Sequence, residues 1–119
     1  MTLLLVGLGG AFGSITRYAL GKYIAEHSRG TIPWGTALVN VSGAFLLGLL
    51  HGAGAPADAQ RLLADGFLGA FTTFSTFFHE GVTLFQDNER KNAAVYLLGT
   101  LALGLLGCLA GVLVGRSLL

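Results

Sequence analysis

Four segments of this 119-residue chain are long and apolar enough to cross a lipid bilayer as helices. They run over about 3–23, 31–50, 62–85 and 92–115, and the second and fourth carry no charged residue. A bilayer core about 30 Å thick needs about 20 helical residues. Because the links between the segments are short and polar, sequential helices are expected to be antiparallel neighbours. The sequence therefore predicts an all-α membrane protein, a single four-helix domain over residues 1–119.

The composition excludes several classes of protein. Charged residues make up 11% of the chain, against about 25% in soluble domains, and the mean hydropathy is +0.70. A net charge of +1 without a basic cluster argues against a nucleic-acid partner. The single cysteine, Cys108, has no partner for an intrachain disulfide. No nucleophile and base stand in a pattern that predicts an enzyme.

Glycine recurs at helical spacing within the expected spans. Small residues four apart let helix backbones approach closely, which replaces the hydrophobic drive in lipid. Such packing leaves no space for a water-filled hole inside one subunit, so a conduction path is expected between subunits. The spaced glycines are Gly9 and Gly13, Gly48 and Gly52, and Gly107, Gly111 and Gly115.

The third segment carries a cluster of hydroxyls near its middle, at Thr72, Thr73, Ser75 and Thr76. Lipid offers these groups no hydrogen-bond partner, and a helix breaks at membrane depth only where protein or a cavity surrounds it. With glycine upstream at Gly69, this is where the third helix is expected to break. The alternative is that each hydroxyl bonds back to the preceding turn.

The second segment places one amide, Asn40, within an apolar run. It serves either as a hydrogen-bonded link between helices or as a pair of N–H donors for an anion. Phe74 and Phe77 are three apart and are expected to share a helix face. They either fill space or present their positive ring edges to an anion, next to Ser75 and Thr76.

Several polar and aromatic residues fall towards the expected span ends. Arg17, His79 and Glu80 map to the same side of the membrane, where such groups often form a surface ion pair. Trp34 and Tyr96 also fall near span ends, where amphipathic rings favour the headgroup region.

Three runs of residues together resemble the signatures of the CrcB/Fluc family of fluoride channels, in order and at the expected spacing. The run of hydroxyls and phenylalanines is the specific part of the match, whereas the glycine motif alone is weak. The runs are Gly9-Gly10-Ala11-Phe12-Gly13 with Arg17-Tyr18, then Trp34-Gly35-Thr36 with Val39-Asn40 and Gly43, then Gly69-Ala70-Phe71-Thr72-Thr73-Phe74-Ser75-Thr76-Phe77 with Glu80.

The resemblance implies an antiparallel, dual-topology homodimer in the cell membrane, with two fluoride pores and passive efflux of fluoride from a microbial cell. It implies a structural Na⁺ at the dimer centre, held by the backbone carbonyls of Gly69 and Thr72. The fourth segment departs from the pattern, since Thr100 is its only hydroxyl at mid-span and Gly104 stands where another is expected. The implied pore residues are Phe74, Phe77, Asn40, Ser75, Thr76 and Tyr96, with Arg17 and Glu80 near a pore mouth.

Two other functions remain open on the residues alone. A small dual-topology multidrug exporter also has four short helices, but it needs a buried acid, and Asp65 and Glu80 lie near span ends. A membrane accessory subunit without transport activity explains the glycines but not the hydroxyl cluster. Two basic residues near span ends lie on the N-terminal side of the membrane, and four lie on the other side. The two are Arg61 and Arg116, and the four are Lys22, Arg29, Arg90 and Lys91. That bias is weak for the positive-inside rule and permits both orientations.

Overall fold

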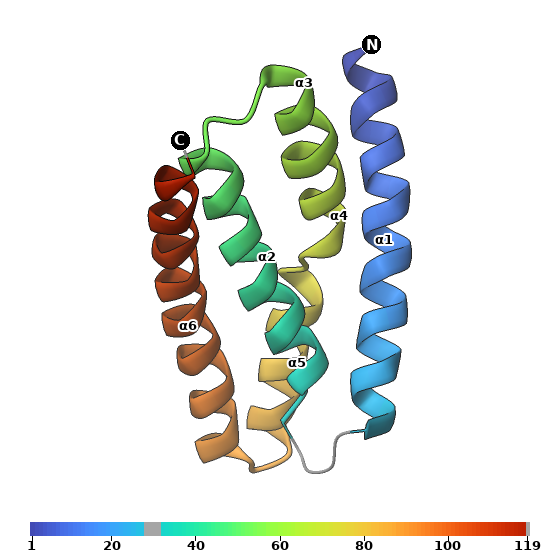
Figure 1. Cartoon of the computed structure of the whole chain (residues 1–119). Coiled ribbons are helices and arrows are strands. Elements are labelled where there is room, and N and C mark those ends of the chain that lie inside the picture. Colours follow the sequence, from blue (N-terminus) through green and yellow to red (C-terminus); the bar gives the residue numbers. More distant parts are fainter. Residues whose placement is uncertain (28–31, 119) are drawn as a thin grey trace.

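A computed structural model describes residues 1–27 and 32–118 of the chain, and within these residues the only regular structure is helical (Figure 1). The expected link from Ser28 to Gly30 and the expected start of the second span at residue 31 lie outside the described residues. The elements are α1 (Thr2–His27), α2 (Trp34–Gly52), α3 (Ala57–Ala59), the π-helix η1 (Gln60–Leu68), α4 (Gly69–Phe71), α5 (Ser75–Gln86) and α6 (Arg90–Ser117).

Three of these helices, α1, α2 and α6, are long and apolar enough to cross a membrane. The third expected span is not one continuous helix. It consists of α3, η1 and α4, then three residues without helical assignment, and then α5. The break expected at the hydroxyl cluster is therefore confirmed, at Thr72 to Phe74.

The spaced glycines do bring helix backbones together. On α2, a Cβ at Gly52 would lie 2.8 Å from the Cα of Val112 in α6. On α6, a Cβ at Gly115 would lie 2.6 Å from the backbone N of Ala53. Glycine thus lies on both sides of the α2–α6 contact, where any larger side chain would push the helices apart.

The third segment packs on α1 in the same way. A Cβ at Gly9 would lie 2.8 Å from the backbone N of Phe67, and one at Gly66 would lie 3.0 Å from the Cα of Gly9. The π-helical turns of η1 themselves form this contact, and no residue pattern in 60–68 predicts them. Wide turns of this kind are rare in proteins, and those that occur are often found at functional sites.

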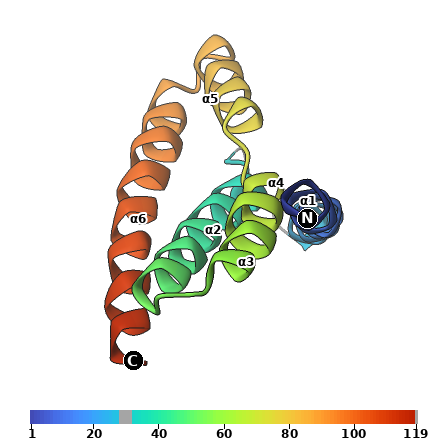
Figure 2. The ribbon, with the colours of Figure 1, turned by 90° about the horizontal axis from the view of Figure 1, so that it is seen from above.

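The two halves of the third segment lie against different helices. Figure 1 shows α1 beside η1 and α4, with α6 along α2 and both chain ends at the same end of the bundle. Seen from above, α5 lies apart from α1 and close to α6 (Figure 2). The break therefore directs α5 away from α1.

Two small buried clusters lie on either side of the break. One joins α2 to the upstream half through Val39, Leu68 and Phe71. The other joins α5 to α6 and includes Phe77 and Tyr96. Tyr96 is only 2% exposed, because its ring packs against Phe77 of α5 rather than pointing outward from the chain.

Candidate functional site

The third segment leaves the helical conformation at Thr72. Its backbone is extended, with φ −80° and ψ 155°, and the helix resumes at Ser75. The Thr72 hydroxyl donates to the carbonyl of Leu68 at 2.9 Å, so the alternative of bonding to the preceding turn applies to this hydroxyl. Gly43 of α2 faces it, and a Cβ there would collide with the Thr72 methyl group. Glycine at 43 therefore lets α2 approach the break.

Asn40 binds the broken backbone with both ends of its amide. Its Nδ2 donates to the carbonyl oxygen of Thr73 at 2.9 Å, and the N–H of Thr73 donates to its Oδ1, also at 2.9 Å. An amide nitrogen carries two N–H groups, so one donor of Asn40 remains. Asn40 thus links two segments, and it keeps one N–H for another acceptor.

In a continuous helix, the carbonyls of Gly69 and Thr72 would accept hydrogen bonds from backbone N–H groups. Here two side chains accept those hydrogen bonds instead. A helical carbonyl accepts from the N–H four residues later. The N–H of Thr73 donates to Asn40, and the N–H of Thr76 donates to the Thr73 hydroxyl at 3.4 Å. Across residues 1–27 and 32–118, no hydrogen bond ends on either carbonyl oxygen. Both oxygens are left for a donor or a cation.

The two phenylalanines of the site adjoin but point differently. Their ring centroids are 6.5 Å apart and their planes are inclined by 52°. Phe77 is 5% exposed and packs on Tyr96, with centroids 5.1 Å apart, whereas Phe74 is 74% exposed. The expected common helix face is wrong, because Phe74 precedes α5 within the break and turns outward.

Three hydroxyls near these rings lack hydrogen-bond acceptors within the described part of the chain. Ser75 and Thr76 open α5, are exposed and donate no recorded bond from their hydroxyls. The hydroxyl of Tyr96 is buried and has no partner. Buried polar groups nearly always have a partner, so Tyr96 is an available donor beside Phe77.

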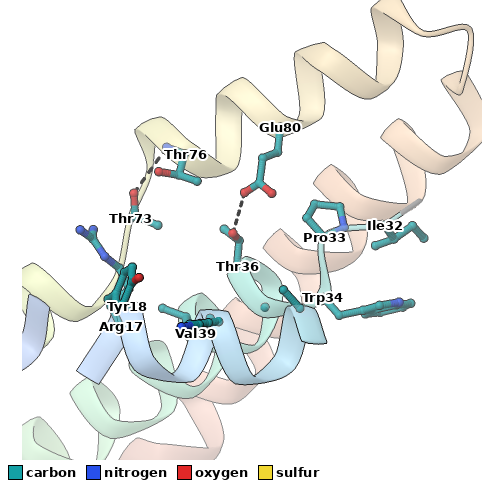
Figure 3. Close-up of a pocket in the computed structure, with 14 residues that line it drawn as sticks. Arg17, Tyr18, Ile32, Pro33, Trp34, Thr36, Val39, Thr73, Thr76 and Glu80 are labelled. Atoms are coloured by element: carbon teal, nitrogen blue, oxygen red, sulfur yellow. Dashed lines mark hydrogen bonds between the residues drawn. The ribbon is translucent and has the colours of Figure 1, made fainter. Parts of the chain in front are cut away.

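A cavity of about 550 Å³ opens between α1, the start of α2, and α5, and we call it the arginine cavity (Figure 3). Arg17 of α1, Thr73 and Thr76 lie on its wall. Glu80 of α5 faces Thr36 of α2 across it, and the Thr36 hydroxyl donates to the carboxylate at 2.6 Å. This cavity is open at the surface of the chain and exists because α5 diverges from α1 after the break. The expected conduction path between subunits stays a prediction.

Arg17 and Glu80 share this cavity without forming an ion pair. The one ion pair among the described residues joins Arg61 to Asp58. Glu80 is engaged by Thr36, and Arg17 lies beside Thr73 at the level of the break rather than at a span end (Figure 3). The surface ion pair considered from the sequence is therefore absent.

A second cavity, the break groove, lies on the other side of Thr73. It has a volume of about 460 Å³ and is lined by residues of α2, the break and α6, including Asn40, Phe74, Phe77 and Thr100. Thr73 lines both this groove and the arginine cavity. The Asn40–Thr73 pair is thus a shared wall between two openings in the protein.

The sequence argument did not assign a role to Thr36. Its partner Glu80 is 44 positions away, and only the fold brings the two together. The available signal was its spacing, since Thr36 lies one helical turn before Asn40 and so shares a face with it.

The sequence matches a known family over most of its length. The family described as "CrcB-like protein, Camphor Resistance (CrcB)" matches residues 4–112. The chain is 47% identical to "Fluoride-specific ion channel FluC 2" of Clostridium acetobutylicum over 111 residues, 93% of this chain and 95% of that protein. It is 46% identical to a protein of the same name from Moorella thermoacetica, over 99% of each chain.

A third relative matches the chain to a similar extent. It is the "Fluoride-specific ion channel FluC" of Thermus thermophilus, 43% identical over 97% of this chain and 94% of that protein. These relatives are named as ion channels, which agrees with the sequence-based expectation of no enzyme. Together with the three membrane-capable helices, they identify a multi-pass membrane protein.

Removing the Asn40 amide should destabilise the break. Asn40→Ala leaves the N–H and the carbonyl of Thr73 unpaired, at a cost of about 1–3 kcal/mol for each group. We expect the unfolding temperature in detergent to fall by at least about 4 °C. The unfolding temperature of Asn40→Asp should fall at least as far, because a carboxylate oxygen would replace the N–H donor and repel the carbonyl oxygen of Thr73.

Ser42→Ala is the matched control, since Ser42 bonds only to Val39 of its own helix. Unfolding of Asn40→Ala at the same temperature as this control would contradict the structural role of the amide.

Proposed function

We propose that this chain, which belongs to the family of CrcB-like proteins, is a fluoride-selective channel that lets fluoride leave the cell passively. The choice of fluoride as the ion rests on the names of the relatives. One structural observation supports the proposal beyond those names. Two cavities meet at Thr73, and the side chains around this meeting point offer hydrogen-bond donors to an anion.

The proposed pore runs from the arginine cavity through the break to the break groove. Fluoride is a small, strongly hydrated anion, so it needs donors that replace its water without holding it by a fixed charge. The remaining N–H of Asn40, the hydroxyls of Ser75, Thr76 and Tyr96, and the ring edges of Phe74 and Phe77 form the proposed track.

Arg17 and Glu80 are the proposed mouth of the pore. The guanidinium of Arg17 is always charged and raises the local concentration of anions in the cavity. Glu80 is a carboxylate and repels them, but the Thr36 hydroxyl bonds to it. In this proposal Thr36 keeps the carboxylate in place on the far wall, so that the anion passes on the side of Arg17.

The functional unit is proposed to be an antiparallel homodimer. Phe74 is exposed, the break groove is open to the outside of the chain, and Gly69 presents its backbone on the same surface. In a single chain, the polar backbone groups at this surface would face lipid at mid-membrane depth, and lipid offers them no hydrogen-bond partner. A second copy related by a two-fold axis would cover them and complete two pores.

The proposed structural Na⁺ lies at the centre of that dimer. The carbonyls of Gly69 and Thr72 lack hydrogen bonds within the described chain, so the residues present fit an alkali cation, which takes hard oxygen ligands. Two carbonyls from each copy would supply four oxygens. A bound cation would also offset the cost of an anion near the membrane centre.

Fluoride efflux from liposomes that contain only this protein is the test of function. Phe74→Ile and Phe77→Ile should each lower the flux about tenfold, the equivalent of about 1.4 kcal/mol. Phe85→Ile is the control, since Phe85 is an exposed phenylalanine of α5 that lines neither cavity.

Wild-type liposomes without fluoride flux would overturn the channel and favour an accessory subunit. Flux that requires a proton gradient would favour an exporter instead. A normal flux in the purified Phe74→Ile, Phe77→Ile double variant would remove the two rings from the pore.

Dual topology should appear as two populations in cells. Basic residues of the described chain lie at both ends, with Arg61 and Arg116 at one end and Lys22, Arg90 and Lys91 at the other. A reporter fused to the C-terminus should therefore be found on both sides of the membrane. A single location would exclude the antiparallel dimer.

Replacing Na⁺ with a large organic cation should lower the fluoride flux or the fraction of dimer, because the freed carbonyls would lose their ligand. The measurement compares flux and cross-linked dimer in the two salts at equal ionic strength. If neither changes, and no density lies on the dimer axis, the site does not exist.

A further inference from the structure

A third cavity lies between α2 and α6 and has no role in the proposed pore. This outer groove has a volume of about 450 Å³. Its wall includes Trp34, Leu38 and Val41 of α2 and Val95, Gly99 and Leu103 of α6. Its polar lining residues, Tyr96 and Thr100, are themselves buried. The groove therefore offers an incoming molecule an almost wholly apolar surface.

The groove runs inward from the membrane surface. Trp34 is the first residue of α2. Val41 lies seven positions further along, which corresponds to about 10 Å along a helix. A bilayer half is about 15 Å thick. Trp34, half exposed, lies where indole rings settle at the headgroup level. The shape and length of the groove thus match the upper part of an acyl chain.

A single basic residue stands at the surface end of the same helix face. Lys91, Val95, Gly99 and Leu103 follow one another at intervals of four residues and so lie in one row on α6. Helical side chains lean towards the helix N-terminus, which directs Lys91 outward to the headgroup layer. The apolar groove and the cationic side chain of Lys91 therefore lie along the same row of α6.

The two charged residues directly before Lys91 interact with other groups. Arg90 stacks over the ring of Phe85, 5.2 Å from its centroid, and Glu89 accepts a hydrogen bond from Asn92 at 2.8 Å. Within the described chain Lys91 makes no ion pair. Its ammonium group is thus available to an anionic partner.

The outer groove and the break groove lie on different sides of α6, with the buried Thr100 between them. Leu101 lines the break groove and Leu103 lines the outer groove. Two positions apart on a helix, these side chains point in nearly opposite directions. A second copy docked over the break groove therefore leaves the outer groove facing lipid.

We propose that the outer groove binds an anionic phospholipid, with one acyl chain along α2 and α6 and the phosphate at Lys91. The apolar lining accepts the chain, and Lys91 supplies the charge complementarity that a zwitterionic lipid would use less well. A basic residue near an anionic membrane surface contributes a factor of about five in binding.

Trp34 is the only tryptophan of the chain and lies between the outer groove and the arginine cavity, so the variants below are needed to assign its quenching to the groove. The protein is reconstituted into vesicles that contain brominated phosphatidylglycerol or brominated phosphatidylcholine, and quenching of Trp34 gives the relative binding constant. We expect about a fivefold preference for the anionic lipid at low salt, decreasing as salt screens the charge.

Two pairs of variants locate the site. Lys91→Gln should remove the preference, whereas Arg90→Gln should retain it. Gly99→Leu should reduce quenching by both lipids, because a Cβ at Gly99 meets no protein atom within 4 Å and the new side chain fills the groove. Gly7→Leu is its control, since Gly7 also has open space and lines none of the three cavities.

Equal quenching by the two lipids in the wild-type protein would overturn the proposal. So would a preference that persists in Lys91→Gln, or one that falls equally in Arg90→Gln, since either indicates general surface attraction. Absence of quenching by both lipids would mean that another occupant, such as a second copy, covers the groove. None of these outcomes depends on fluoride flux, so this proposal and the proposed function fail separately.

Discussion

Two hydrogen bonds of 2.9 Å between the amide of Asn40 and the backbone of Thr73 hold the break in the third segment. Lipid cannot satisfy an open backbone, so an interruption at this depth requires a protein partner. Asn40 is that partner, and Gly43, one turn further along α2, leaves space for the Thr72 side chain. The same contact diverts the N–H of Thr73 from the Gly69 carbonyl. The Asn40 amide thereby holds the course of the chain and leaves the Gly69 oxygen free, and the Thr73 hydroxyl does the same for the Thr72 oxygen by accepting from the N–H of Thr76.

The direction of α5 follows from this contact. Upstream of the break, the third segment packs against α1 through Gly9 and Gly66. Downstream, Phe77 packs against Tyr96 of α6. Because the two halves belong to different neighbours, a cavity opens between α1 and α5, and Arg17 and Glu80 line it. The glycine contact holds α2 and α6 together near Gly52 and Gly115, whereas the outer groove lies nearer the start of α2.

The sequence predicted the local features of the site well. Hydroxyls and glycine in the third segment predicted its break, and the break lies at Thr72 to Phe74. Spaced glycines predicted close helix contacts, and the structure pairs α2 with α6 through them. The predictions that failed involve directions in space. Phe74 and Phe77 were expected on one helix face, yet one ring is exposed and the other buried. The expected surface ion pair of Arg17 and Glu80 is replaced by the bond from Thr36.

The sequence by itself determined that the chain is a helical membrane protein, at which glycines its helices can approach closely, and where the third one is interrupted. These properties follow from length, charge and residue spacing, which act over a few turns of one helix. Only the tertiary structure decided that Asn40 binds Thr73, that Thr36 binds Glu80, and that Tyr96 is buried with an unpaired hydroxyl. Each of these contacts joins segments 19 or more positions apart in the sequence. Their geometry depends on the angle at which the chain leaves the break, which no local pattern specifies.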